Sequence, residues 1–160
     1  MPSYSKASAE KLLLTDPRLR AIFELAIEDW DHTIIYGHRT KTDQDDAVAA
    51  GNSQKPWPTS EHNKIPSRAV DGAPYYADVP KGGIDWRTDA ALLAAAKLGD
   101  WDSVKAILEN IKRWIAFSGY IRGIAKARGI KIRSGADWDN DQRFNDHTLI
   151  DLPHFELVDP

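Results

Sequence analysis

The closing segment DLPHFEL alternates apolar and polar side chains, and this period of two constrains the fold of the chain more than any other feature. A β-strand sends successive side chains to opposite faces, so Phe155 and Leu157 are expected to face a core while His154 and Glu156 share the other face. A closing strand with a purely structural histidine would satisfy the pattern. The alternative is that His154 is one ligand of a metal site whose other ligands lie far upstream.

A second segment, SRAVDGAPYY, shows the same period. It places Ala69, Asp71 and Ala73 on one side of a predicted strand and Val70 on the other. Asp71 would then be a carboxylate on an otherwise small and apolar face. Arg68 or backbone amides can satisfy such a carboxylate in a structural role, or the carboxylate can itself bind a metal ion.

The remaining segments predict helices and short strands. In TDPRLRAIFELAIEDW, Asp16 suits an N-cap and Pro17 suits the first helical position, and the apolar residues that follow recur at helical spacing. The other predicted elements are a strand over 33–36, a short helix over 40–51, a loop over 52–59, helices over 90–128, a strand over 130–133 and the closing strand over 147–157. Because short loops connect the later strands, we expect an α+β fold with a small antiparallel sheet and flanking helices.

Length and composition limit the classes of protein that fit. The 160 residues suit one domain over 1–160. The net charge is −3 and the 21 basic residues are scattered among 24 acidic ones, which disfavours nucleic acid as a partner. The chain has no cysteine, so a metal site must use histidine and carboxylate ligands. The sequence shows neither a long apolar run nor a signal-peptide core. We therefore expect that the protein is made in the cytoplasm and does not insert into a membrane.

Two of the five histidines stand in a context that favours metal binding. His62 precedes Asp71 by nine residues, and a loop that leads into a strand can turn both side chains to one point. His154 follows Asp151 by three residues, which places the two on opposite faces of a regular strand. Pro153 lies between them and favours a bulge, which can bring both into one pocket. The histidines interpreted as surface or capping residues are His32, His38 and His147.

These residue types suit a hydrolytic metal site. Two imidazoles and one carboxylate form a ligand set typical of zinc, with a fourth position left for water. A further carboxylate beside that water can serve as its general base. The two histidine–carboxylate pairs therefore contain the side chains that metal-assisted hydrolysis requires.

Four segments resemble the motifs of a known family. SEHNKIPSRAVD resembles a Ser-x-His…Ala-x-Asp motif, and DLPHFEL resembles an Asp/Glu-x-x-His motif. YGHRTKTDQ is similar to a Gly-x-Arg-Thr segment with a following Gln, and IRSGADWDND is similar to a Gly-Gly-Asp-Trp stretch. In this order they resemble the zinc peptidoglycan peptidases, which include D-Ala-D-Ala carboxypeptidases and dipeptidases and the phage L-alanyl-D-glutamate endopeptidases, or endolysins. The resemblance spans about 14–157.

The resemblance implies roles for individual residues within a fold of the hedgehog and DD-peptidase type. It implies one Zn²⁺ per chain, held by His62, Asp71 and His154. It makes Asp151 the base that activates the attacking water and later protonates the leaving amine. Arg39 would hold the polarised carbonyl or the oxyanion. The implied hydrogen-bond partners of the substrate are Ser60 and Gln44.

The activity that the resemblance implies is hydrolysis of a peptide bond in the stem peptide of peptidoglycan, between L-Ala and D-Glu, by a monomeric phage-type endolysin. Because the motifs extend over nearly the whole chain, we expect no separate cell-wall-binding module. Access to the wall would then depend on a holin-like partner that permeabilises the membrane. Two alternatives stay open: a D-Ala-D-Ala carboxypeptidase or dipeptidase, and a catalytically silent zinc-containing module that binds wall peptides.

Departures from the motifs carry expectations of their own. Eight residues separate His62 from Asp71, more than in the shortest form of the motif, so the KIPS segment must bulge outward around Pro66. Gly135 and Ala136 stand where the family has two glycines. The sequence assigns no role to Glu156 or to the predicted helical segment 91–110.

An acidic cluster formed by Asp137, Asp139 and Asp141 follows the predicted strand over 130–133. Gln142 stands where an EF-hand loop has glycine, and Thr148 stands where it has glutamate. A solvated acidic loop is the simpler interpretation, and weak Ca²⁺ binding is the alternative.

Overall fold

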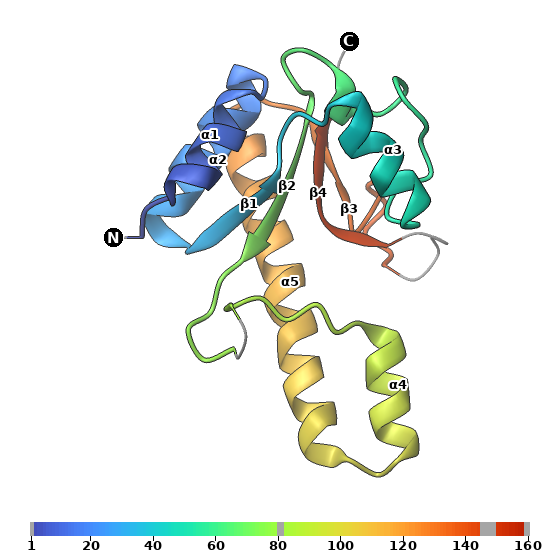
Figure 1. Cartoon of the computed structure of the whole chain (residues 1–160). Coiled ribbons are helices and arrows are strands. Elements are labelled where there is room, and N and C mark those ends of the chain that lie inside the picture. The colour runs from blue at the N-terminus through green and yellow to red at the C-terminus, as the bar shows by residue number, and fades with distance from the viewer. Residues whose placement is uncertain (1, 80–81, 145–149, 159–160) are drawn as a thin grey trace.

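The computed structural model describes residues 2–79, 82–144 and 150–158 (Figure 1). Its strands form one four-stranded sheet in the order β1-β2-β4-β3, and each neighbouring pair is antiparallel. The elements in chain order are α1 (Lys6–Leu13), α2 (Pro17–Asp29), β1 (His32–Tyr36), α3 (Lys41–Ala49), the 3₁₀ helix η1 (Glu61–Asn63), β2 (Ala69–Pro74), α4 (Asp89–Lys97), α5 (Trp101–Ala127), β3 (Ile132–Gly135) and β4 (Asp151–Leu157). The predicted α+β fold with a small antiparallel sheet is confirmed.

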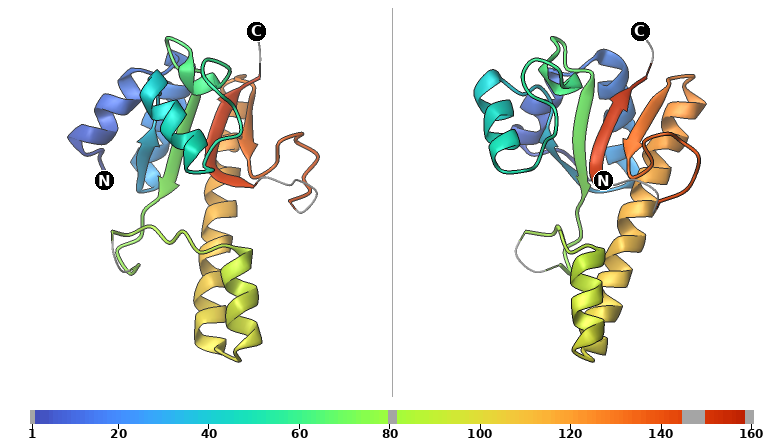
Figure 2. Two further views of the ribbon diagram at one scale, coloured as in Figure 1. Left: turned by 45° about the vertical axis from the view of Figure 1, so that its right-hand side comes forward. Right: turned by 90° about the vertical axis from the view of Figure 1, so that its right-hand side faces the viewer.

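One face of the sheet packs against α2 and α5 and forms the apolar core. Phe155 of β4 lies edge-on to Phe23 of α2 and to Phe117 of α5, with ring centroids 5.6 and 6.1 Å apart. None of these three rings has exposed surface, and burial of such a side chain contributes about 1.5–3 kcal/mol. In the right-hand view of Figure 2, α3 and α5 lie on opposite sides of the strands. The face away from the core is therefore free to carry polar groups.

The register of β2 and β4 keeps the two faces apart. Val70 pairs with Phe155 on the core face, and the next pair along, Asp71 with His154, lies on the other face. The alternation predicted for both strands is thus confirmed, and it brings a carboxylate and an imidazole 83 residues apart in the chain into direct cross-strand contact.

The helices that the sequence predicts begin and end close to the expected positions. At the start of α2, Asp16 Oδ1 accepts a hydrogen bond from the backbone N–H of Arg18 at 2.9 Å, and Pro17 occupies the first turn. The short helix α3 ends before Gly51, which has a positive φ of 75°. The helical region 90–128 divides at Gly99 into α4 and a continuous 27-residue α5.

Part of α5 extends beyond the edge of the sheet, where α4 packs antiparallel along it (Figures 1 and 2). Together they form an arm that projects away from the sheet. The arm contains the 91–110 segment to which the sequence assigned no role. Within the described residues, no helix combines the length and apolar character needed to cross a bilayer.

Three elements differ from what the sequence predicts. The helix α1 was not predicted, although Ser5 caps it by accepting a hydrogen bond from the Ser8 backbone N–H at 3.2 Å. The strand predicted over 130–133 lies over Ile132–Gly135, two residues later. The closing strand begins at Asp151 within the described residues, and the 147–149 part of the prediction lies outside them.

His32 was predicted to be a surface or capping residue, and this is wrong. It is 3% exposed because it begins β1 in phase with the buried Ile34, so it faces the core. Its Nδ1 lies 2.7 Å from the Trp30 carbonyl oxygen and its Nε2 lies 2.5 Å from the Tyr4 hydroxyl. Burial lowers the pKa of His32 to about 4. His38 is half-buried, and His147 lies outside the described residues.

Candidate metal centre

Three elements bring His62, Asp71 and His154 together on the polar face of the sheet. His62 lies in η1, which Ser60 caps by accepting a hydrogen bond from the His62 backbone N–H. The segment 64–66 between η1 and β2 is exposed, as the predicted outward bulge around Pro66 requires. The His62 Nε2 lies 3.1 Å from Asp71 Oδ1 and 3.2 Å from His154 Nδ1, and the last two atoms are 3.1 Å apart.

The outer atoms of these side chains are held by other groups. His62 Nδ1 donates to the Gly37 carbonyl oxygen at 2.6 Å, and His154 Nε2 donates to Glu156 Oε2 at 3.0 Å. In the neutral rings, His62 Nε2 and His154 Nδ1 therefore carry lone pairs that face each other and Asp71 Oδ1. Three converging acceptors repel one another unless a cation or a proton lies among them.

The pKa values of Asp71 and His154 reflect this convergence. Burial alone would raise the pKa of Asp71, but the charge and hydrogen bonds of His62 and His154 outweigh it and hold that pKa well below its usual range. Burial alone would lower the pKa of His154, but hydrogen bonds to Asp71 and Glu156 raise it to about 9. The pocket thus favours positive charge at its centre.

The donor set fits zinc. Tetrahedral zinc with nitrogen and oxygen ligands at about 2.0–2.1 Å has ligand–ligand edges of about 3.3 Å. The three edges of 3.1–3.2 Å between the candidate ligand atoms are close to this value. All three residues are buried, and each already has the outer-shell hydrogen bond that orients a ligand in metal sites. They could hold one metal ion.

Asp151 reaches the same pocket through an irregularity in β4. Gly135 of β3 pairs with Asp151 while its neighbour Ser134 pairs with Phe155, so β4 carries extra residues between these two pairs. The bulge predicted around Pro153 is therefore present. A Cβ on Gly135 would lie 2.3 Å from the Asp151 carbonyl oxygen, which explains why glycine is needed there. Burial, together with the charge of Asp71, raises the pKa of Asp151.

Arg39 lies on the other side of Asp71. Its Nη2 donates to Asp71 Oδ2 at 2.5 Å, and its guanidinium stacks over the Tyr36 ring at 4.7 Å. The buried Arg39 Nε has no hydrogen-bond partner among the described residues. Arg39 therefore holds Asp71 in place, and its Nε–H is a donor available to a ligand.

Two cavities meet at this centre. One, of about 300 Å³, is lined by His62, His154 and Ser60, and the other, of about 430 Å³, is lined by Asp71. Arg39 and Asp151 line both cavities. A ligand that extends from one cavity into the other would therefore pass directly over the groups predicted to act in catalysis.

Comparison with known proteins agrees with this arrangement. The chain matches the sequence profile of the phage L-alanyl-D-glutamate peptidases over residues 2–158. It belongs to this family. The L-alanyl-D-glutamate peptidase of Escherichia phage T5 is 30% identical to it over 160 residues, with 97% of each chain covered. The crystal structure of the Serratia marcescens L-Ala D-Glu endopeptidase ChiX resembles it with a TM-score of 0.63 at 24% identity, over 97% of this chain and 89% of that one, which supports the fold.

Gln44, which was predicted as a hydrogen-bond partner of the substrate, makes hydrogen bonds to other residues of the protein. Its side chain has no exposed surface. Its amide nitrogen donates to Ser53 Oγ at 2.8 Å and to the Lys55 carbonyl oxygen at 2.7 Å, and its amide oxygen accepts from Asn63 Nδ2 at 3.2 Å. Gln44 therefore fastens the 52–59 loop against η1. Ser60 lines the smaller cavity but is only 5% exposed, with its hydroxyl capping η1.

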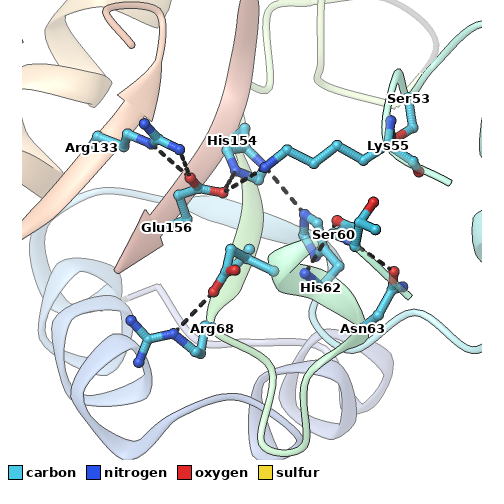
Figure 3. A network of polar contacts seen from close by, with 12 residues as sticks. Ser53, Lys55, Ser60, His62, Asn63, Arg68, Arg133, His154 and Glu156 are labelled. Carbon is cyan, nitrogen blue, oxygen red and sulfur yellow. Dashed lines mark hydrogen bonds and ion pairs between the residues drawn. The ribbon is translucent and has the colours of Figure 1, made fainter. Parts of the chain in front are cut away.

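Sequence reasoning left Glu156 without a role, and the structure gives it a central position. Figure 3 shows Arg133 and Lys55 pointing at its carboxylate from opposite sides, with His154 between them. Arg133 Nη2 lies 2.5 Å from Glu156 Oε1, and Lys55 Nζ lies 3.9 Å from Oε2. Burial opposes ionisation, yet the hydrogen bond from His154 lowers the pKa of Glu156 to about 2. The signal in the sequence was its position two residues after His154, on the same strand face.

Trp138 was also missed as part of this centre. Its ring centroid lies 5.1 Å from that of His154, with the two rings tilted by 36°, and the Arg133 guanidinium carbon lies 5.5 Å from the centroid of the Trp138 ring. The indole therefore covers the imidazole and lines the smaller cavity. Nothing in the local pattern GADWD distinguishes an aromatic that shields a ligand from one in a solvated loop.

The acidic cluster lies next to Trp138. Asp137, Asp139 and Asp141 each offer one oxygen within 4.8 Å of the others. Asp137 is fully buried, where its Oδ2 pairs with Arg122 Nη1 at 2.9 Å, while the other two are exposed. The part of the loop over 145–149 lies outside the described residues.

Proposed function

We propose that this chain is a zinc-dependent endopeptidase that hydrolyses the L-Ala–D-Glu bond in the stem peptide of bacterial peptidoglycan, as a phage-type endolysin. The observation that carries the proposal is the convergence of three lone-pair atoms at 3.1–3.2 Å beside a carboxyl group, Asp151, whose pKa is raised. The named activity of the phage T5 relative supports the choice of bond.

His62, Asp71 and His154 would hold the zinc ion, since their oriented acceptors match its preferred ligands. When bound, the ion supplies Lewis-acid polarisation of the substrate carbonyl and makes water more acidic. The surrounding residues keep the ligands in the correct tautomer, because Gly37 and Glu156 accept the outer imidazole protons.

Asp151 would act as the general base and then as the general acid. Its raised pKa lies closer to neutral pH than that of an ordinary carboxyl group, so it can both take a proton from water and return it to the leaving amine. It lines both cavities, which supports a position beside a bound peptide. Arg39 would hold the carbonyl oxygen as negative charge develops on it. Its Nε–H, which has no partner among the described residues, would donate to that oxygen.

Two alternatives make different products. A D-Ala-D-Ala carboxypeptidase or dipeptidase would use the same side chains on a different bond, and a silent binding module would make no product. The half-buried Asp151, whose pKa is raised, favours turnover, because binding alone has no use for a base.

Mass spectrometry of purified peptidoglycan after digestion tests the proposal. The expected product is a stem peptide with a new D-Glu amino terminus, together with glycan that retains L-Ala. Release of only terminal D-Ala would contradict the endopeptidase assignment, and intact stem peptides would contradict both enzymatic assignments. Metal analysis of the same protein should find one zinc per chain.

The biological setting that we propose is action on the cell wall by a monomeric catalytic domain made in the cytoplasm. Access to the wall would come from a holin-like partner. Turbidity of host cells should therefore fall only when the membrane is permeabilised before the protein is added. Size-exclusion chromatography with light scattering tests the monomer.

Weak calcium binding by Asp137, Asp139 and Asp141 completes the proposal. The Oδ1 atom of Asp137 is buried without a hydrogen-bond partner among the described residues, which supports a cation there, while Arg122 already neutralises part of the charge. Titration with Ca²⁺ followed by tryptophan fluorescence of Trp138 tests it, with Asp139→Asn as the variant that should weaken the response.

A further inference from the structure

A groove adjoins the smaller of the two cavities, the one that His154 lines. It has a volume of about 490 Å³, and its charged lining consists of Lys55, Glu61, Lys64, Arg68, Arg133 and Glu156. Lys55, Arg133 and Glu156 also line the cavity of the metal centre. The two hollows therefore share a wall, and a peptide in one can reach into the other.

The groove carries excess positive charge. Its two carboxylates are each held by an arginine: Arg68 Nε lies 2.9 Å from Glu61 Oε2, and Arg133 Nη2 lies 2.5 Å from Glu156 Oε1. The positive charges of Lys55 and Lys64 are therefore in excess. Four cationic and two anionic side chains give a local charge of +2, whereas the whole chain has −3.

The two lysines are available to a ligand. The Lys55 side chain is 45% exposed and touches Glu156 only at 3.9 Å, and that carboxylate already has an arginine and His154 as closer partners. Lys64 is exposed on the outward bulge after η1 and has no ion pair with any carboxylate in the described part of the chain. Both ammonium groups can therefore turn toward an anion without breaking a strong contact.

We propose that this groove is a carboxylate subsite that binds the free carboxyl group of the D-glutamyl residue on the amine side of the scissile bond. This inference rests on the proposed function. A glutamyl residue has two carboxyl groups and only one can continue the peptide chain, so the other is an anion a few bonds from the bond that is cut. Lys55, one of the two excess cations, lies on the wall shared with the cavity of the metal centre, next to where that bond would lie.

The charges of the groove select a single carboxylate rather than a polyanion. A phosphate polymer needs several clustered cations that no carboxylate neutralises. Here Glu61 and Glu156 stand among the cations and repel additional negative charge. Two lysines match one carboxylate, and the exposed setting keeps each contact modest.

A matched pair of peptides tests the subsite. Both contain the L-Ala–D-Glu bond, but one has the free glutamyl carboxylate and the other has the carboxamide at that position. The wild-type protein should cleave the free acid with a kcat/KM about tenfold higher, since two exposed lysine contacts are each worth roughly threefold. The Lys55→Ala/Lys64→Ala double variant should cleave both peptides at nearly equal rates.

The double variant Lys97→Ala/Lys105→Ala is the matched control, because it removes two exposed lysines from the α4–α5 arm. It should keep the wild-type preference, and all three proteins should keep the same zinc content. Cleavage of neither peptide by the wild type would refute the proposed function and the subsite with it. Equal cleavage of both by the wild type, an unchanged preference in the Lys55→Ala/Lys64→Ala variant, or an equal loss in the control would refute the subsite and leave the function standing.

Discussion

The two faces of the sheet treat histidine in opposite ways. His32 lies on the core face among Phe23 and Phe117, where burial lowers its pKa to about 4. His154 lies on the polar face, where it is equally buried but hydrogen-bonded to Asp71 and Glu156, and its pKa rises to about 9. Burial is the same in both places, so the carboxylate partners decide the direction.

One small sheet thus separates stability on one face from chemistry on the other. Phe155 and His154 are neighbours in the chain, yet one has its ring in the aromatic core and the other has its ring against Asp71 and Trp138. Because the strand period is two, a substitution at one position should leave the function of the other face largely intact. Substitutions on the two faces test this separation.

Replacement of His154 by alanine should remove the metal and the activity. The variant loses a candidate ligand, so its zinc content after dialysis should fall far below one per chain and its hydrolysis rate by more than about 100-fold. Asp151→Asn is the matched control: it should keep its zinc and lose about 10²- to 10⁴-fold in rate. Metal analysis and a muropeptide assay measure both. Full zinc content in His154→Ala would show that the ligand assignment is wrong.

Replacement of Phe155 by alanine should act on the other face. Removing this fully buried ring should lower the free energy of unfolding by about 3–5 kcal/mol, while the folded fraction keeps its zinc. Urea unfolding followed by circular dichroism, together with metal analysis of the folded protein, measures the two effects. Loss of zinc from protein that is still folded would mean that the faces are coupled.

The acid sensitivity of the core should depend on His32. Its pKa is about 4 in the folded state and about 6.5 in the unfolded state, so the unfolded state binds more protons between these values. Its contribution is therefore complete above pH 6.5 and is lost as the pH falls toward 4, by up to about 3 kcal/mol.

Urea unfolding of chelator-treated protein between pH 4.5 and 7.5 measures this effect without interference from metal loss. The variant His32→Phe should show a flatter dependence on pH than the wild type over this interval. Parallel curves for the two proteins would contradict the assignment of this acid sensitivity to His32.

Replacement of Glu156 by glutamine should weaken the metal centre less than the loss of a ligand does. Glutamine keeps an acceptor for His154 Nε2 but removes the charge that raises the basicity of the ring, so zinc affinity should fall by about 10- to 100-fold. Competition with a chelator measures the affinity. Glu61→Gln is the matched control, because its carboxylate pairs with Arg68 in the adjoining groove and touches no ligand candidate. An equal change in both variants would argue for a general effect of charge.

Much of the candidate centre could be predicted from local pattern. The period-two alternation placed Asp71 on the opposite strand face from Val70, and His154 on the opposite face from Phe155. Pro153 indicated the bulge that brings Asp151 into the same pocket. The same rule would have found His32, had the alternation been extended back from Ile34. These features depend on neighbours in the chain and therefore leave a local signal.

The partners that come from distant elements could not be predicted in this way. Glu156 meets Arg133 because β3 lies beside β4, and it meets Lys55 because Gln44 fastens the 52–59 loop over the sheet. The strand order β1-β2-β4-β3 and the path of a loop are set by packing of the whole chain. The helices α4 and α5 leave a local signal and were predicted. Their projection away from the sheet depends on packing and was not predicted.

The separation of the candidate ligands along the chain has a consequence for a protein without cysteine. His62 and His154 lie 92 residues apart, so an ion held between them would close a loop that includes most of the fold. A disulfide across a loop of about 100 residues stabilises by about 4–5 kcal/mol in the chain-entropy description. A cation at this centre would act as a removable cross-link of the same kind, and the protein would lose this stabilisation wherever the metal is withdrawn.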